Sequence, residues 1–251
     1  HTITTPYGTV TAQQIVFACP YPFPLIPGYY FSRMYQEQSY VLALSGALDL
    51  EGMYLGIDPD GLSLRWAGKT LLLGGFGHRT GRLEGHPYKS LSSAACSLFP
   101  QARTICHWSA QDCMTLDSLP YIGRFSRKNP HWFVATGFGK WGVTLSMVSA
   151  LLLTDLICCG NSPWEHLYSP LRFPRISALP RLAGHVAESA RGLVKGLFPG
   201  VMRCPHMGCK LSWNEAESTW DCPCHGSRFD SSGKLISGPS QTSCRCHKLI
   251  P

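Results

Sequence analysis

The sequence predicts an α+β fold, a mixed or antiparallel sheet with helices, over residues 1–164. Residues 29–75 contain short alternating or β-branched segments separated by Gly and Asp-Gly turns, which is typical of strands. Apolar residues recur at helical spacing within 86–100, and a glycine-rich turn at 137–142 leads into an apolar helix that ends near Gly160. A small module rich in Cys and His follows at 201–251, after a linker at 165–200.

Turn residues mark the individual elements. Residues 1–17 predict a β-hairpin that turns at Pro6–Gly8 and continues into a short strand at 15–18. Pro59-Asp60-Gly61 predicts a turn between two strands of the sheet. The glycines of 74–81 lack the Gly-x-Gly-x-x-Gly spacing, so we expect a loop there and not a dinucleotide site. Three prolines mark the linker, which ends in a weakly amphipathic helix at 182–197.

Composition limits the kinds of molecule that this protein is expected to bind. The net charge of +7 is mild and its Lys and Arg residues are scattered, so nucleic acid is not an expected partner of this 251-residue chain. The longest apolar run, 147–158, is too short to span a bilayer, and we interpret it as a buried helix.

Cysteine usage predicts the compartment. Six of the twelve cysteines stand in apolar or helical surroundings, as reduced core residues do: Cys19, Cys96, Cys106, Cys113, Cys158 and Cys159. We therefore expect a cytoplasmic protein.

Cys204-x-His206 and, fifteen residues later, Cys222-x-x-His225 supply two thiolates and two imidazoles. Structural zinc uses the same ligand types. Zinc fingers usually pair Cys with Cys and His with His, however, whereas here each loop carries one of each, which favours a two-iron cluster.

The full pattern, C-x-H-x-x-C followed by C-P-C-H-G-S, resembles the Rieske family. The resemblance implies a small all-β domain and a [2Fe–2S] cluster, with one iron on Cys204 and Cys222 and the other on His206 and His225. It also implies further residues around the cluster: a Cys209–Cys224 disulfide between the loops, a Ser227 hydroxyl on a bridging sulfide, and Pro239 in a loop that covers the cluster.

Two departures from the family follow. Phe229 stands where high-potential members carry Tyr, so we expect an intermediate potential. Only FPGVMR separates the linker helix from Cys204, so part of the usual β-scaffold is expected to be absent.

Two segments before the linker carry a second resemblance. The pattern W-x-x-Q-D-x-x-x-x-D-x-x-P-x-I-G runs from Trp108 to Gly123, and T-G-F-x-x-x-G-x-T runs from 136 to 144. Together they resemble the FAD-dependent oxidoreductases of the D-amino-acid and glycine oxidase superfamily. From the residues alone, Asp112 and Asp117 are loop carboxylates that cap turns.

The glycine-rich turn before the apolar helix places backbone N–H groups at a helix N-terminus, which favours an anion. A tight strand-to-helix turn that needs Gly for packing is the alternative. The oxidase resemblance implies that this turn lines FAD through Gly137, Phe138, Gly139, Lys140, Trp141, Gly142 and Thr144.

The sequence therefore predicts an oxidoreductase that passes electrons between a flavin, which oxidises a small amine or amino-acid-like substrate, and a Rieske cluster. A redox partner protein or carrier is expected, and no catalytic residue is identified. A ferredoxin-like carrier without catalysis and a zinc-stabilised binding module are the alternatives. The chain begins at His1, after the point at which the resemblance places the Gly-x-Gly-x-x-Gly strand–turn–helix that opens such oxidases, so we expect it to be the C-terminal part of a longer protein. No spacing suits the two-His, one-carboxylate iron of an oxygenase.

Overall fold

The structure is a computed structural model that describes residues 1–58, 61–172 and 178–244. The chain forms two compact units. The first comprises residues 1–35 and 112–191, and the second comprises 36–111 and 192–251. Secondary structure is mixed, which confirms the predicted α+β class.

The first unit opens with the predicted hairpin, in which β1 (Thr2–Thr5) pairs antiparallel with β2 (Gly8–Thr11). A three-stranded sheet follows, in the order β3 (Ile15–Ala18), β10 (Asn129–Thr136) and β9 (Tyr121–Ser126). A 3₁₀ turn, η1 (Tyr30–Ser32), precedes the second unit, and the short helix α3 (Glu165–Tyr168) was not predicted. Strand β10 leads through the glycine turn into α2 (Gly142–Cys158), as expected.

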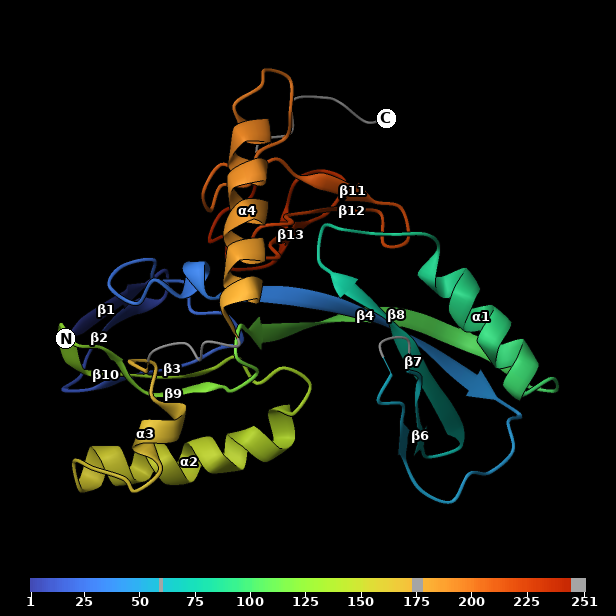
Figure 1. The fold of residues 1–251 in the computed structure, drawn as a ribbon, viewed down its shortest axis with the longest axis horizontal. Coiled ribbons are helices and arrows are strands. Elements are labelled where there is room, and N and C mark those ends of the chain that lie inside the picture. Colours follow the sequence, from blue (N-terminus) through green and yellow to red (C-terminus); the bar gives the residue numbers. More distant parts are fainter. Residues whose placement is uncertain (59–60, 173–177, 245–251) are drawn as a thin grey trace. The chain divides into compact units, whose positions relative to one another are not determined.

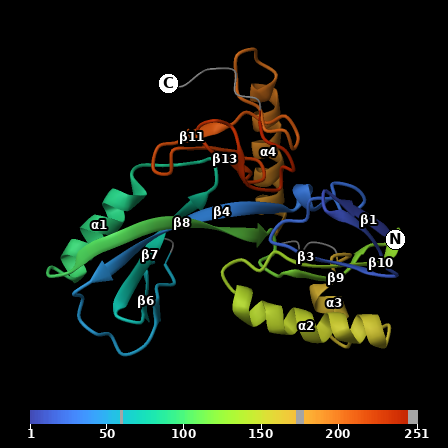
Figure 2. The ribbon, with the colours of Figure 1, turned by 180° about the vertical axis from the view of Figure 1, so that it is seen from behind.

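Helix α2 packs one face on the three-stranded sheet (Figure 2). Its Leu152 and Leu156 join Ile122 and Phe133 in one buried cluster. The prediction of a helix buried throughout 147–158 is wrong, because Met147 and Leu151 are 65% and 71% exposed on the other face. Among the residues that the structure describes, no helix is both long and apolar enough to cross a membrane.

The second unit contains a five-stranded sheet (Figure 1). Its order is β5 (Tyr54–Leu55), β6 (Ser63–Ala67), β7 (Thr70–Arg79), β4 (Met34–Ser45) and β8 (Arg103–Thr115). Helix α1 (Pro87–Leu98) covers one face, where its Leu91 and Ala95 pack against Leu42 and Leu73. This helix and its packing on the sheet confirm the prediction for 86–100.

The strand register assigns side chains to the two faces of this sheet. Tyr40 and Leu42 lie on the α1 face, and because neighbours along a strand alternate, Val41 lies on the opposite face. Val41 is paired with Gly74, and Gly74 is paired with Ser63, so these residues share that second face. The loop expected at 74–81 is wrong, since β7 extends to Arg79 through a bulge. The expected turn at Pro59–Gly61 lies partly outside the described residues.

The Cys- and His-rich module also belongs to the second unit. Its four short strands pair consecutively: β11 (Ser212–Asn214), β12 (Thr219–Asp221), β13 (Arg228–Phe229) and β14 (Leu235–Ser237). This small antiparallel sheet confirms the predicted all-β module. Helix α4 (Leu179–Gly196) precedes it and covers most of the helix expected at 182–197.

The predicted segment limits 1–164, 165–200 and 201–251 follow the order of the sequence, whereas the compact units are discontinuous, and the limits stay a prediction. The cysteines outside the module correct another expectation. Cys113 is buried and Cys19 is half-buried, but the others are exposed rather than in a core: Cys96, Cys106, Cys158 and Cys159.

Candidate functional site

Two hydrogen-bonded turns carry the predicted cluster ligands. In the first, the Cys204 N–H donates to Cys209 O at 2.8 Å and the Gly208 N–H donates to Cys204 O at 2.8 Å. In the second, the Cys222 N–H donates to Ser227 O at 2.8 Å and the Gly226 N–H donates to Cys222 O at 2.9 Å. Gly208 and Gly226 have φ of 85° and 87°, a region that favours glycine, so each turn depends on its glycine.

The predicted ligands converge between these turns. The rings of His206 and His225 lie edge to face, with centroids 5.0 Å apart. Cys204 and Cys222 are each 1% exposed, and a hydrogen bond to the Cys222 sulfur, with burial, raises the pKa of Cys204. The structure therefore brings one Cys–His pair from each turn together, with Cys204, Cys222 and His225 buried and His206 half-buried.

His206 shows that this place suits a metal. Both of its ring nitrogens are buried and make no hydrogen bond with any described residue. Buried polar atoms are normally paired, so this imidazole is left with unmet bonding capacity. Burial also lowers the pKa of His206 to about 4. A neutral imidazole is the form that binds a metal.

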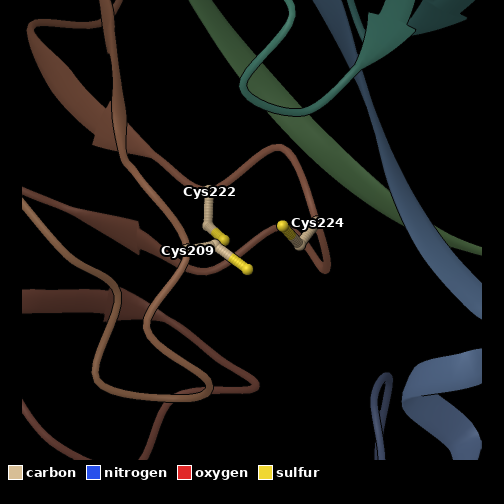
Figure 3. A group of neighbouring side chains, drawn as sticks. All are labelled: Cys209, Cys222 and Cys224. Atoms are coloured by element: carbon tan, nitrogen blue, oxygen red, sulfur yellow. The ribbon is translucent and has the colours of Figure 1, made fainter. Parts of the chain in front are cut away.

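Three sulfurs lie especially close together: those of Cys209, Cys222 and Cys224 are all within 4.8 Å of one another (Figure 3). This group mixes one predicted ligand with the predicted disulfide pair, and Cys209 and Cys224 are not bonded to each other. We favour the two-Cys, two-His set because only that set employs the unpaired ring of His206. The disulfide stays a prediction, supported by the proximity of its two sulfurs.

The second ligand turn and its neighbours are buried. Every residue from Asp221 to Phe229 is buried. Ser227 is fully buried, and its Oγ accepts a hydrogen bond from the Ser240 N–H at 2.9 Å. Pro239, immediately before Ser240, is buried as well. The predicted hydroxyl and covering segment therefore lie side by side, beside the ligand loop.

The predicted flavin element lies in the first unit. Gly137 is buried with φ of 72°, and a Cβ there would come within 2.4 Å of the Thr115 Cγ2. This contact supports the packing interpretation for Gly137. Toward the helix the loop opens outward: Lys140, Trp141, Gly142 and Thr144 are exposed, whereas Phe138 and Gly139 are half-buried.

The N-terminus of α2 suits an anionic group. The N-cap residue, Trp141, makes no side-chain capping bond, and no acidic residue occupies the first turn. The first N–H groups of a helix lack partners within the helix and carry the positive end of its dipole. The glycine loop and α2 thus fit the negatively charged side of a flavin, with Lys140 at the entrance.

The segment 108–123 differs from its prediction in one part. Asp112 lies on β8, not in a loop. Asp117 does cap a turn, accepting a hydrogen bond from the Leu119 N–H at 3.3 Å, and it also pairs with Arg172 at 2.8 Å. Burial acts to raise the pKa of Asp117, but the bonds and charge of Arg172 outweigh it, so that the pKa is lowered.

A cavity of about 250 Å³ lies against the second face of the five-stranded sheet. Its wall is mostly apolar, with Val41 and Trp108 from the sheet and Tyr54 at the edge strand, and Arg65 supplies a positive charge. Trp108 belongs to a segment that the sequence singled out. Tyr54 and Arg65 do not stand out in the sequence, because only the strand pairing brings them to this wall.

Three polar side chains of the same sheet make contacts with the second ligand turn that were not predicted: Gln36, Arg79 and Gln111. Gln111 stands in the W-x-x-Q-D pattern, and Gln36 alternates with apolar residues on a buried face, where a polar residue needs a partner. Neither signal identified the ligand turn as that partner.

Comparison with known proteins agrees with the two expected cofactors, FAD and a [2Fe–2S] cluster. The family model for FAD dependent oxidoreductase matches residues 1–156, and that for the Rieske [2Fe-2S] domain matches residues 196–248. The "Putative Rieske 2Fe-2S iron-sulfur protein YhfW" of Bacillus subtilis (strain 168) is 34% identical over 282 residues, covering 95% of this chain and 55% of the relative. The cytochrome b6-f complex iron-sulfur subunit 1 of Nostoc sp. (strain PCC 7120) is 50% identical over 40 residues, which is 16% of this chain and 22% of that protein.

Solved structures show a similar fold. Glycine oxidase from Geobacillus kaustophilus has a TM-score of 0.57 at 22% identity, covering 69% of this chain and 49% of that one. L-proline dehydrogenase from P. horikoshii has a TM-score of 0.53 at 18% identity, with 68% and 50% covered. The chain spans about half the length of these relatives. Since one family model matches most of its residues, the chain belongs to the FAD dependent oxidoreductase family and carries a Rieske [2Fe-2S] domain at residues 196–248.

Proposed function

We propose that this protein passes electrons between a flavin, which oxidises a small amine or amino-acid-like substrate, and a Rieske [2Fe–2S] cluster. The observation that supports this most is the convergence of Cys204, His206, Cys222 and His225, with both nitrogens of the His206 ring buried and unpaired among the described residues. Rieske domains bind a [2Fe–2S] cluster through such a set. Bound FAD would supply hydride acceptance from the substrate.

The residues of the chain have distinct proposed roles. Cys204 and Cys222 would hold one iron, and His206 and His225 the other. A Cys209–Cys224 disulfide would join the two turns, while Ser227 and Pro239 would bond and cover the cluster. Around FAD, the backbone of Gly137–Gly142 and the first turn of α2 would present N–H groups, apart from those of Gly139 and Trp141, which already donate to Cys113 O and Phe138 O at 3.0 Å. Lys140 would supply a positive charge, and Phe138, Trp141 and Thr144 would supply contact surface.

The cavity beside Val41 and Trp108 is the proposed substrate site. Its apolar wall fits the carbon part of a small amine or amino acid. The guanidinium of Arg65 would attract a carboxylate if the substrate carries one.

The sheet relates this cavity to the cluster module. Val41 points into the cavity, whereas Gln36 and Gln38, on the other face of the same strand, bond residues of the module. This arrangement within the second unit supports transfer of electrons inside the protein.

A redox partner that removes electrons from the cluster, a protein or a small carrier, is part of the proposal. So is a cytoplasmic location, because exposed free thiols such as Cys158 and Cys159 persist in a reducing compartment.

Rapid mixing of the full-length protein tests the function. The oxidised protein is mixed without oxygen with candidate amines or amino acids, and the flavin and cluster absorbances are followed separately. We expect the flavin to bleach first and the cluster second. In a Cys204→Ser variant only the first phase should remain. Bleaching of the flavin with no reduction of an intact cluster would refute the transfer.

Metal analysis separates the alternatives. The proposal requires two irons and two acid-labile sulfides per chain. One zinc and no sulfide would instead identify the zinc-stabilised module. Iron and sulfide in a full-length protein that binds no flavin would identify a ferredoxin-like carrier.

A further inference from the structure

The second ligand turn is held from outside by the five-stranded sheet. Four consecutive carbonyl oxygens of the turn, from Pro223 to Gly226, each accept a hydrogen bond from a side chain of that sheet. The four bonds run from Arg79 Nε to Pro223 O at 2.8 Å, Arg79 Nη2 to Cys224 O at 2.8 Å, Gln36 Nε2 to His225 O at 3.0 Å, and Gln111 Nε2 to Gly226 O at 2.8 Å.

These three donors come from three adjacent strands. Arg79 ends β7, Gln36 lies near the start of β4, and Gln111 lies on β8. Gln36 is 4% exposed, and its second N–H bonds Gly238 O at 2.9 Å, beside the proline of the covering segment. One amide thus connects the ligand turn to the cover of the site.

Two glycines show how closely the turn lies on the sheet. A Cβ at Gly81 would come within 2.6 Å of the Pro223 nitrogen, and a Cβ at Gly226 would come within 2.6 Å of the Gln36 Cβ. No methyl group fits at either place. The turn therefore rests directly on the backbone and side chains of the sheet.

We propose that Gln36, Arg79 and Gln111 are positioning residues that fix this turn against the sheet and thereby raise the reduction potential of the cluster. The inference rests on the proposed function, in that the turn holds a [2Fe–2S] cluster. It assigns to residues of the oxidase part a role in the Rieske site.

The physical link is the peptide group. In a trans peptide the carbonyl and the following N–H point in opposite directions, so donors on the sheet direct the N–H groups of the turn away from it. Of these, the Gly226 N–H donates to Cys222 O within the turn at 2.9 Å, so Gln36 acts by holding the turn in place, while the bonds to Pro223, Cys224 and Gly226 act on the N–H groups that follow them. A bond to the carbonyl also polarises the peptide and strengthens its N–H as a donor. Hydrogen bonds to cluster sulfurs are one of the factors that set the potential of iron–sulfur clusters. Loss of the sheet donors therefore lowers the potential.

Substitutions in the full-length protein test this role. Gln36→Met and Gln111→Met keep the length of the side chain and remove its hydrogen-bond donors. Arg79→Lys keeps the positive charge but removes the planar guanidinium that donates to two carbonyls at once. Gln101→Met and Arg103→Lys are controls on exposed residues of the same unit. Gly81→Ala has a matched control in Gly85→Ala, because Gly85 also has a positive φ, 69° against 77°, but no described atom within 4 Å of its Cβ position.

Three readouts distinguish positioning from mere folding: iron and sulfide per chain, the midpoint potential in a redox titration, and the EPR spectrum of the reduced cluster. We expect the two Gln→Met variants and Arg79→Lys to keep their iron but to titrate at a lower potential with shifted EPR features. Gly81→Ala should lose iron to a chelator faster than Gly85→Ala. The other controls should match the wild type.

The results of these measurements either support or refute the proposed positioning role. Wild-type potential and EPR spectrum in all three donor variants would refute it while leaving the proposed function intact. If Gln36→Met does not fold, Gln111→Met, with a single bond to the turn, decides the matter by its potential. A wild-type protein without iron and sulfide would refute the proposed function and this inference together.

Discussion

Two glycines of helix α4 offer a matched test of how the cluster module is packed. A Cβ at Gly192 would come within 2.5 Å of the Cys224 sulfur, whereas a Cβ at Gly184, on the same helix, would meet no described atom within 4 Å. The substitutions Gly192→Ala and Gly184→Ala are chemically identical. They differ only in whether the added methyl group collides with the module.

The magnitudes follow from two effects. Replacing Gly by Ala inside a helix stabilises it by about 0.8–1.0 kcal/mol. Overpacking a tight site costs about 1–3 kcal/mol. Gly184→Ala should therefore gain about 1 kcal/mol, or about 2–4 °C in Tm for a chain of this size. Gly192→Ala should show the same gain minus the steric cost, so that it lies about 1–3 kcal/mol below Gly184→Ala.

Thermal unfolding of the two variants and the wild type, followed by circular dichroism, measures this difference. Because the helix gain is common to both variants, their difference isolates the contact with Cys224. Gly192→Ala should also alter the visible spectrum of the loaded cluster, and Gly184→Ala should not. Equal stabilisation of both variants would show that α4 does not pack against the Cys224 turn as the structure has it.

Three further predictions concern charges and ligands. Arg228→Met should destabilise the protein by about 3–5 kcal/mol in urea unfolding, because the fully buried Asp221 carboxylate, bonded to Arg228 at 3.2 Å, would lose its positively charged partner. Adding Asp221→Asn to this variant should restore part of the lost stability. The Arg172–Asp117 pair lowers the pKa of Asp117, so its contribution is complete above about pH 4 and declines as pH falls through that lowered pKa. The stability difference between wild type and Arg172→Met should therefore be large at pH 7 and shrink below pH 4; a constant difference would contradict it. His206→Ala should purify with less iron than the wild type, and unchanged iron and spectrum would rule out His206 as a ligand.

The elements that the sequence predicted well are those with strong local signals. The hairpin at 1–17, the helix at 86–100 and the strand–turn–helix around Gly137 have turn residues or periodicity that act over a few residues. The predicted ligands were readable for the same reason, since a Cys and a His two or three residues apart in each turn are a local pattern.

The wrong predictions concern segments whose structure is set by contacts with residues that are distant in the sequence. The glycines at 74–81 suggested a loop, but pairing with β4 holds them in a strand with a bulge. The sequence suggested that Asp112 caps a turn in a loop, but in the structure it lies within strand β8. Helix α2 looked fully buried because its composition is apolar, yet only its Leu152 and Leu156 face contacts the sheet. The donors to the ligand turn could not be found either, since Gln36 lies 189 residues from its partner His225.

The short module explains why such distant contacts are needed. Its four strands have two or three residues each, and chains of this size bury too little apolar surface to be stable alone without a metal, a disulfide or a neighbour. The sequence indicated a shortened scaffold, and the sheet of the oxidase part supplies bonds in its place through Gln36, Arg79 and Gln111. A mobile carrier must present its cluster to successive partners. Here residues 221–229 are buried and four carbonyls of that turn are bonded to the sheet, while His206 on the other turn is half-buried. The bonds between this turn and the sheet support the proposed transfer within the protein over a ferredoxin-like carrier.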